Sequence, residues 1–293
     1  MNGFSNYHPA VLFAYFLAAL LLTMFTVNPV LLALTLLGSV CFFSILHKPR
    51  DFWQNLAFYI PMFLLLAVTN PLFSHNGETP LFFLNDNPVT LEAIVYGAAI
   101  AVMLISVIFW FKCLNDVMTS DKFLYLFGRL IPKLSLILSM ALRFVPLFKA
   151  QIKKIHQTQK TLGLYASKSV ADRLLGGFRV LSVLITWSLE NAVDTAASMK
   201  ARGYGIKGRT SFSLFRFRAE DGALLGAIAA LCALVFLGFG GGRLDFHYYP
   251  YISPLTFDFT AWLGYAAALL LFFLPFAIEI KENLQWKYLR SRI

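Results

Sequence analysis

The sequence predicts an all-α, polytopic membrane protein, and three features support that fold class: the composition, the apolar runs and the placement of the charges. Hydrophobic residues make up 58% of the 293 residues, whereas charged residues make up 14%. A soluble domain needs about 25% charged residues to cover its surface. The deficit indicates a membrane protein, and we expect about six transmembrane helices with long cytoplasmic helices between the fourth and fifth spans.

Six apolar runs approach the roughly 20 residues that a helix needs to cross a bilayer. They cover residues 10–27, 30–46, 56–73, 93–111, 222–240 and 260–280. Asn28-Pro29 is expected to form the turn between the first two runs. The first run is too long for a typical signal peptide and has no basic segment before it, so we expect it to be a retained span.

The basic residues are distributed unevenly along the chain. Segments 47–50, 112–218 and 281–293 hold 2, 18 and 4 of the 25 Lys and Arg residues, and Arg243 alone lies elsewhere. The positive-inside rule therefore places these three segments and both termini in the cytoplasm. This orientation, with contact to anionic membrane lipid, accounts for the net charge of +10, so we expect no nucleic-acid partner.

We divide the chain into three parts by composition. Residues 1–112 form an N-terminal membrane part with four spans, residues 113–218 a cytoplasmic helical region, and residues 219–293 a C-terminal membrane part with two spans and a basic tail. The middle part is strongly apolar, but its basic residues recur at intervals too short for a free span. Its apolar faces either pack on each other and on the membrane interface or form a docking surface for another membrane protein.

Two long helices are expected within this middle part. Pro132 and Pro146 are expected to divide segment 121–162 into at least two helices, the last of which ends at Gly163. The second long helix covers roughly 169–202.

The end of the second helix carries the most informative pattern in the chain. A polar stripe of residues spaced three and four apart lies on one face and consists of Ser188, Asn191, Thr195, Ser198 and Arg202. Gly203 stands where a left-handed capping residue is needed, and a guanidinium in the last turn suits the negative end of the helix dipole. This end is either a well-capped helix with a solubilising arginine or a rigid tip that presents Arg202 to an acidic groove on a partner.

The sequence SMKARGYG, followed by GRTSF, resembles the signature of the transmembrane T component of energy-coupling factor (ECF) transporters. Segment 134–149 (LSLILSMALRFVPLFK) supports the resemblance, as do Tyr7-His8-Pro9 and Asn28-Pro29 more weakly. The resemblance implies a non-catalytic subunit of an ECF-type ABC importer in the cell membrane. Such a subunit transmits the ATP-driven motion of two cytoplasmic ABC ATPase subunits to a substrate-binding S component, for uptake of a vitamin or another micronutrient.

The resemblance also assigns site residues within what it identifies as the coupling-helix region, residues 113–218. In that family an Ala-Arg-Gly motif at a helix end docks into a groove of an ATPase subunit, which implies the docking residues Ala201, Arg202 and Gly203.

The family usually carries a second arginine motif at the end of the preceding helix, where this chain has Thr161-Leu162-Gly163. Leucine in place of arginine puts a symmetric pair of arginine contacts in question. Possible supplementary docking residues are Lys160, Leu162, Gly163 and Arg209.

The sequence contains no motif for covalent chemistry or ATP binding. It lacks GxxxxGK[ST], HExxH, CxxC and GxSxG, and its five His and three Cys residues are scattered. We therefore expect no catalytic residue, no metal site and no cofactor. An alternative function, from a different class, is that of an integral membrane enzyme that acts on lipid at the cytoplasmic interface through Glu190 and Asp194. Pairing with nearby basic residues is the more ordinary role of such carboxylates.

Overall fold

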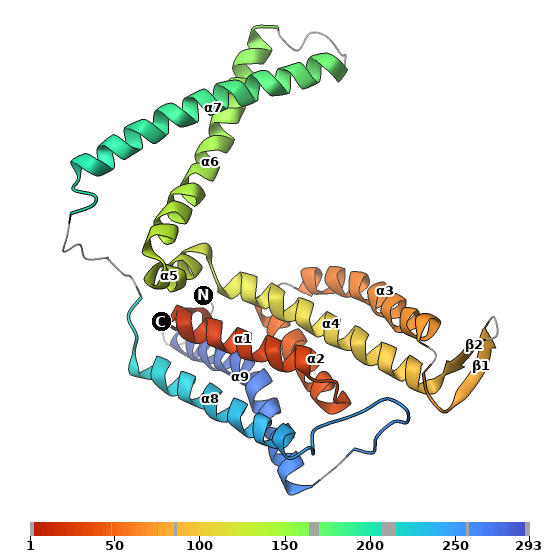
Figure 1. Cartoon of the computed structure of the whole chain (residues 1–293). Coiled ribbons are helices and arrows are strands. Elements are labelled where there is room, and N and C mark those ends of the chain that lie inside the picture. The colour runs from red at the N-terminus through yellow and green to blue at the C-terminus, as the bar shows by residue number, and fades with distance from the viewer. Residues whose placement is uncertain are drawn as a thin grey trace. The chain divides into compact units, whose positions relative to one another are not determined.

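The computed structural model describes residues 3–290, apart from residues 48, 75, 85–86, 164–169, 207–214 and 256–257. The chain folds into two compact units (Figure 1). The first, which we name the bundle unit, comprises Met1–Phe123 and Phe215–Ile293. The second, the crossed-helix unit, comprises Leu124–Leu214.

The bundle unit is built from long apolar helices that pack side by side. Its helical elements are η1 (Phe4–Asn6), α1 (Pro9–Phe25), α2 (Pro29–Leu46), α3 (Pro49–Phe73), α4 (Leu91–Val117), α8 (Ala219–Gly240) and α9 (Phe259–Arg290). Helix α4 packs against α1, α2 and α3, and α9 packs against α2 and α8 (Figure 1). A short hairpin of β1 (Pro80–Leu84) and β2 (Asn87–Thr90) joins α3 to α4.

Asn28 and Pro29 start α2 shortly after α1 ends, in agreement with the turn that the sequence predicts here. The Asn28 side chain caps α2 by accepting a hydrogen bond from Val30 N at 3.0 Å, and Pro29 occupies the first turn, where no backbone donor is needed. The amide of Asn28 also donates to Leu244 O at 3.1 Å and to the Tyr265 hydroxyl at 3.0 Å. One buried side chain thus satisfies the helix start and joins it to the loop before α9.

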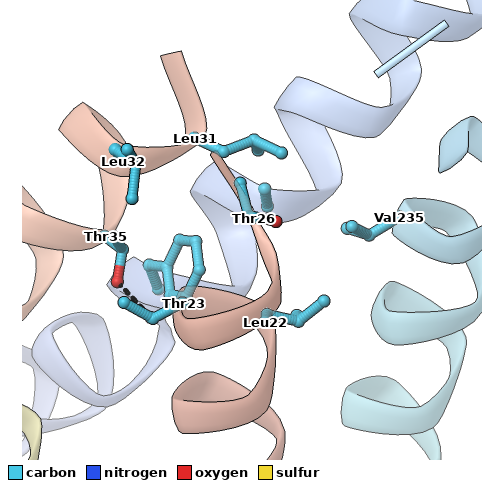
Figure 2. Close-up of a pocket in the computed structure, with 9 residues that line it drawn as sticks. Leu22, Thr23, Thr26, Leu31, Leu32, Thr35 and Val235 are labelled. Atoms are coloured by element: carbon cyan, nitrogen blue, oxygen red, sulfur yellow. Dashed lines mark hydrogen bonds between the residues drawn. The ribbon is translucent and has the colours of Figure 1, made fainter. Parts of the chain in front are cut away.

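The core of the bundle unit is aromatic, and its buried hydroxyl groups bond to one another. Trp110 is fully buried, and its Nε1 donates to Thr35 Oγ1 at 2.9 Å. Thr35 in turn shares a hydrogen bond of 2.8 Å with Thr23, beside a pocket between α1, α2, α8 and α9 (Figure 2). The pocket is lined by Leu22, Thr23, Thr26, Leu31, Leu32, Thr35, Val235, Ala268 and Phe272.

Among the described residues, five helices are long and apolar enough to span a membrane, which confirms the all-α polytopic fold class. They are α2, α4, α8, α9 and α6 (Pro132–Thr161). The first and third predicted spans are present as shorter apolar helices, Pro9–Phe25 and Ala57–Phe73. The basic residues of α6 argue in the sequence against a span here, but four of the six follow Phe148, and the first half, which holds Lys133 and Arg143, is apolar enough for a span.

The crossed-helix unit contains the end of α5 (Ser120–Leu130), then α6 and α7 (Val170–Ala201). Pro132 opens α6, as predicted, but Pro146 lies inside that helix and does not end it. Helices α6 and α7 cross (Figure 1) and are joined by an edge-to-face contact between Phe148 and Trp187, whose ring centroids are 5.9 Å apart. On α6, Ile155 and Gln159 are also buried.

Replacing Thr35 with valine tests the hydroxyl network of the core. Thr35→Val keeps the shape of the side chain but leaves the Trp110 N–H without its acceptor, so we expect the free energy of unfolding to fall by about 1–3 kcal/mol. The measurement is denaturant unfolding in detergent micelles. The matched control is Thr69→Val, since the exposed Thr69 hydroxyl bonds to Leu65 O within its own helix. Equal effects of the two variants would contradict the prediction.

Candidate functional site

The C-terminal end of α7 is closed by a left-handed glycine, as the sequence predicts. Gly203 has a φ of +82°, its N–H donates to Lys200 O at 3.1 Å, and the next N–H, of Tyr204, donates to Met199 O at 3.0 Å. This pair of bonds is the Schellman motif, in which the last residue before the left-handed position is the C-cap. Arg202 is that residue, so its backbone direction is set by the motif.

The side chains at this end point into solvent. Ala201 and Arg202 are exposed, and the described residues supply no hydrogen-bond or ion-pair partner for the Arg202 guanidinium. Two apolar side chains lie close in sequence, Tyr204 with 46% and Ile206 with 70% of its surface exposed. In the described residues, the tip therefore offers Arg202, with Lys200 in the last turn of α7, beside exposed apolar side chains. Sequence reasoning from the Ala-Arg-Gly motif alone did not identify this combination.

The C-terminal end of α6 shares the left-handed glycine and the first closing bond of this pattern. Gly163 has a φ of +74° and its N–H donates to Lys160 O at 3.1 Å. Leu162, with 69% of its surface exposed, therefore occupies the position that Arg202 occupies on α7. Leu162 and Arg202 are equivalent in backbone geometry and opposite in chemistry.

The C-terminal end of α6 and the C-terminal end of α7 lie apart from each other in the crossed pair (Figure 1). Helix α7 has 32 residues, and at 1.5 Å per residue it is about 48 Å long. Since α7 begins soon after α6 ends, this length separates the two ends. Lys160 is exposed in the last turn of α6, whereas Arg209 lies outside the described residues.

The polar stripe on α7 is not a continuous exposed track. Ser188, Asn191 and Thr195 are half-buried, and the first two bond to their own helix: Ser188 Oγ donates to Ile185 O at 2.8 Å and Asn191 Nδ2 to Trp187 O at 3.0 Å. Towards the end of the helix, Ser198 and Arg202 are exposed. The spacing identified residues on one face of the helix, but three of these five residues are half-buried.

Large apolar side chains are exposed along both crossed helices. On α6 they are Leu134, Ile137, Leu138, Leu142, Val145, Leu147 and Ile152, and on α7 Leu174, Leu175, Phe178, Leu181, Val183, Ile185, Leu189 and Val193. So many exposed apolar side chains on two helices are typical of contact with another protein or with a membrane.

Glu190 and Asp194, the carboxylate pair considered for an enzyme, are both exposed on α7. No group of three or more potential metal ligands occurs in the part of the chain that the structure describes. The two carboxylates are therefore not enclosed by the described residues, whereas general acid–base catalysis takes place in a pocket.

Comparison with known proteins gives a consistent result. The family model described as CbiQ, cobalt transport protein, matches residues 5–212, a range that includes both helix ends. The energy-coupling factor transporter transmembrane protein EcfT of Listeria innocua is 32% identical over 190 residues, which cover 60% of this chain and 72% of that protein. EcfT of Bacillus selenitireducens is 26% identical over 222 residues, or 72% of this chain and 83% of that protein. EcfT of Bacillus subtilis is 30% identical over 108 residues, or 36% and 41%.

The helix end can be tested by Gly203→Ala. A Cβ at this position is strained because φ is positive, and it would lie 3.0 Å from Ile206 Cδ1. We expect the closing bonds of α7 to weaken by about 1–2 kcal/mol, seen as faster hydrogen exchange of the amides of residues 203–206. The control is Gly177→Ala inside α7, where the Cβ meets open space and the helix should gain about 0.5–1 kcal/mol. Unchanged exchange in Gly203→Ala would refute the cap.

Proposed function

The chain belongs to the CbiQ family and is a transmembrane T component of an energy-coupling factor transporter, and from this membership we propose that it couples two cytoplasmic ATPase subunits to a substrate-binding S component. The observation that supports this role best is the capped end of α7, which presents Arg202 in solvent at the tip of a long helix. In this proposal the chain itself performs no covalent chemistry.

Arg202 is proposed as the contact to one ATPase subunit. Its planar guanidinium can bind a carboxylate through two parallel hydrogen bonds, and unlike lysine it stays charged when the interface closes. The small side chain of Ala201 and the missing side chain of Gly203 let a groove approach the helix end closely. The Schellman motif holds this end in one conformation, so little ordering entropy is lost on docking.

The end of α6 is proposed as the contact to the second ATPase subunit. Leu162 and Gly163 have the same backbone arrangement there, but the exposed leucine favours an apolar groove over an acidic one. Lys160 can add a charge in the same turn, and Arg209 is a further candidate beyond the end of α7. The two ATPase contacts would thus be unequal.

The crossed helices are proposed to carry the motion. The contact between Phe148 and Trp187 joins α6 and α7 near their crossing point, so displacement of either end moves the pair together. Their exposed apolar faces offer a surface for the S component, which is itself embedded in the membrane.

The charge distribution supports a location in the cell membrane with both termini in the cytoplasm. The cargo is proposed to be a vitamin or another micronutrient. The description of the matching family as cobalt transport proteins includes a metal ion among the candidate micronutrients.

Arg202→Glu is the direct test of docking. The variant reverses the charge that faces the partner, and loss of a charge pair at an interface costs about 2–5 kcal/mol, so the affinity for ATPase subunits should fall by about 30-fold or more. The measurement is affinity purification of the tagged chain from its native membrane, with quantification of ATPase subunits. The matched control is Arg179→Glu, an exposed arginine on the same helix far from its end.

Each outcome of that experiment is informative. Equal recovery of ATPases with Arg202→Glu and with the unaltered chain would make Arg202 the wrong contact. Recovery of ATPases with neither would overturn the coupling function and favour the lipid-enzyme alternative, which predicts turnover by the isolated chain.

Leu162→Glu tests the second contact. Burial of a leucine side chain contributes about 1.5–3 kcal/mol to binding. An apolar groove should therefore bind the Leu162→Met variant and fail to bind the Leu162→Glu variant. Native mass spectrometry of the purified complex should show one ATPase subunit lost from the glutamate variant. A complete complex with Leu162→Glu would contradict the assignment.

A further inference from the structure

The residues just before α1 are built into the core of the bundle unit. We name residues 3–8 the N-terminal segment. The side chain of Phe4 is fully buried and makes edge-to-face contacts with Tyr15, Phe42 and Phe16, with ring centroids 5.4, 5.8 and 6.2 Å apart. A short segment with few backbone hydrogen bonds of its own is buried only where other groups satisfy its polar atoms, so this degree of burial requires specific anchors.

Three buried ionisable side chains supply those anchors. Lys122 Nζ donates to Ser5 O at 2.6 Å and to Ser5 Oγ at 2.8 Å. Asp221 Oδ1 accepts from His8 N at 2.8 Å, and Glu279 Oε2 accepts from Phe4 N at 3.0 Å. The exposed fractions of these three side chains are 7%, 4% and 3%.

Burial of such groups is costly unless hydrogen bonds replace the lost water. For Lys122, burial lowers the pKa below its usual value, as expected for a desolvated ammonium group. The backbone of the N-terminal segment provides replacement partners for all three side chains. Removal of the segment would leave these groups short of partners.

The positions of these anchors in the chain are informative. The crossed-helix unit begins at Leu124 and ends at Leu214, so its two covalent connections to the bundle unit are the segments just before and just after it. Lys122 lies on the first connection and Asp221 follows the second. The ring of Phe217 on the second connection also packs against His8, with centroids 5.3 Å apart.

The third anchor joins the same segment to a long helix. Glu279 belongs to α9, and Glu282 of that helix lies so close to Gly3 that a side chain in place of glycine would collide with its carboxylate. Both connections are thereby tied to α9 through one short stretch of backbone.

We propose that the N-terminal segment is a clamp that holds the two connections of the crossed-helix unit to α9, so that force arriving through either connection moves the bundle unit as one body. This inference rests on the proposed coupling function for its purpose, although the clamp itself can be tested without ATPase subunits. If the clamp opened, the two connections would move independently of each other. ATP hydrolysis would then continue without moving the bundle unit.

The test measures a distance between a connection and α9. Spin labels are placed at Thr119, before α5, and at Gln285 on α9, both exposed, after alanine replaces Cys41, Cys113 and Cys232. In the full chain we expect one narrow distance distribution. Lys122→Met, which removes the two hydrogen bonds to Ser5, and Phe4→Ala, which removes the buried aromatic ring, should both lose this narrow distribution. Lys122→Arg, which keeps a cationic donor, should retain it.

Thr35→Val is the control for general loss of stability, because it weakens the same unit without contact to the N-terminal segment. A broad distribution in Lys122→Met and Phe4→Ala, with a narrow one in Thr35→Val, supports the clamp. A narrow distribution in all variants, or equal broadening in Thr35→Val, overturns it.

A second arm uses the complex purified with its ATPase subunits. Lys122→Met should retain ATPase binding and ATP hydrolysis while the Thr119–Gln285 distance becomes dependent on nucleotide, which the unaltered chain should not show. A distance independent of nucleotide in the variant would overturn the role of the clamp in coupling. If the unaltered chain recovers no ATPase, the proposed function fails, and the first arm still decides on the clamp.

Discussion

The backbone conformation of Gly203 determines which side chain the end of α7 can present to a partner. Because Gly203 adopts a positive φ, the helix stops there, and the N–H groups of Gly203 and Tyr204 fold back onto the last turn. Arg202 is thereby the C-cap residue that directly follows α7, and its side chain is exposed. An arginine one turn earlier, at the position of Ser198, would lie along the side of the helix and not at its end.

Local patterns predicted the parts of this protein that depend on local physics. The apolar runs, the Asn28-Pro29 turn and the glycine cap each follow from residues within a few positions of one another. Pro146 shows the limit of such reasoning, since it lies inside α6 without ending the helix. The polar stripe on α7 is a similar case. Its spacing identified a helix face, but the spacing does not reveal the tertiary packing that half-buries three of its five residues.

The N-terminal segment could not be predicted, because its partners lie more than a hundred residues away. The bond between Phe4 and Glu279 joins positions 275 apart, and the bond between His8 and Asp221 joins positions 213 apart. No periodicity connects such residues. A glutamate at the end of an apolar run, like Glu279, indicates only that the run has reached polar surroundings, and the sequence does not reveal that a backbone N–H is its partner.

The two helix ends combine the same backbone with different side chains, and this combination constrains how the proposed docking can work. A contact through Arg202 depends on direction and on ionic strength, since it rests on a charge pair. A contact through Leu162 depends on buried area and tolerates small displacements, since dispersion and desolvation have little directionality. An ATPase pair that closes and opens would therefore keep hold of the α7 end in a fixed orientation, while the α6 end could shift within its groove. With its 32 residues, α7 is about 48 Å long. If the α7 end were held while the α6 end shifted, the crossed pair would rotate and not simply translate.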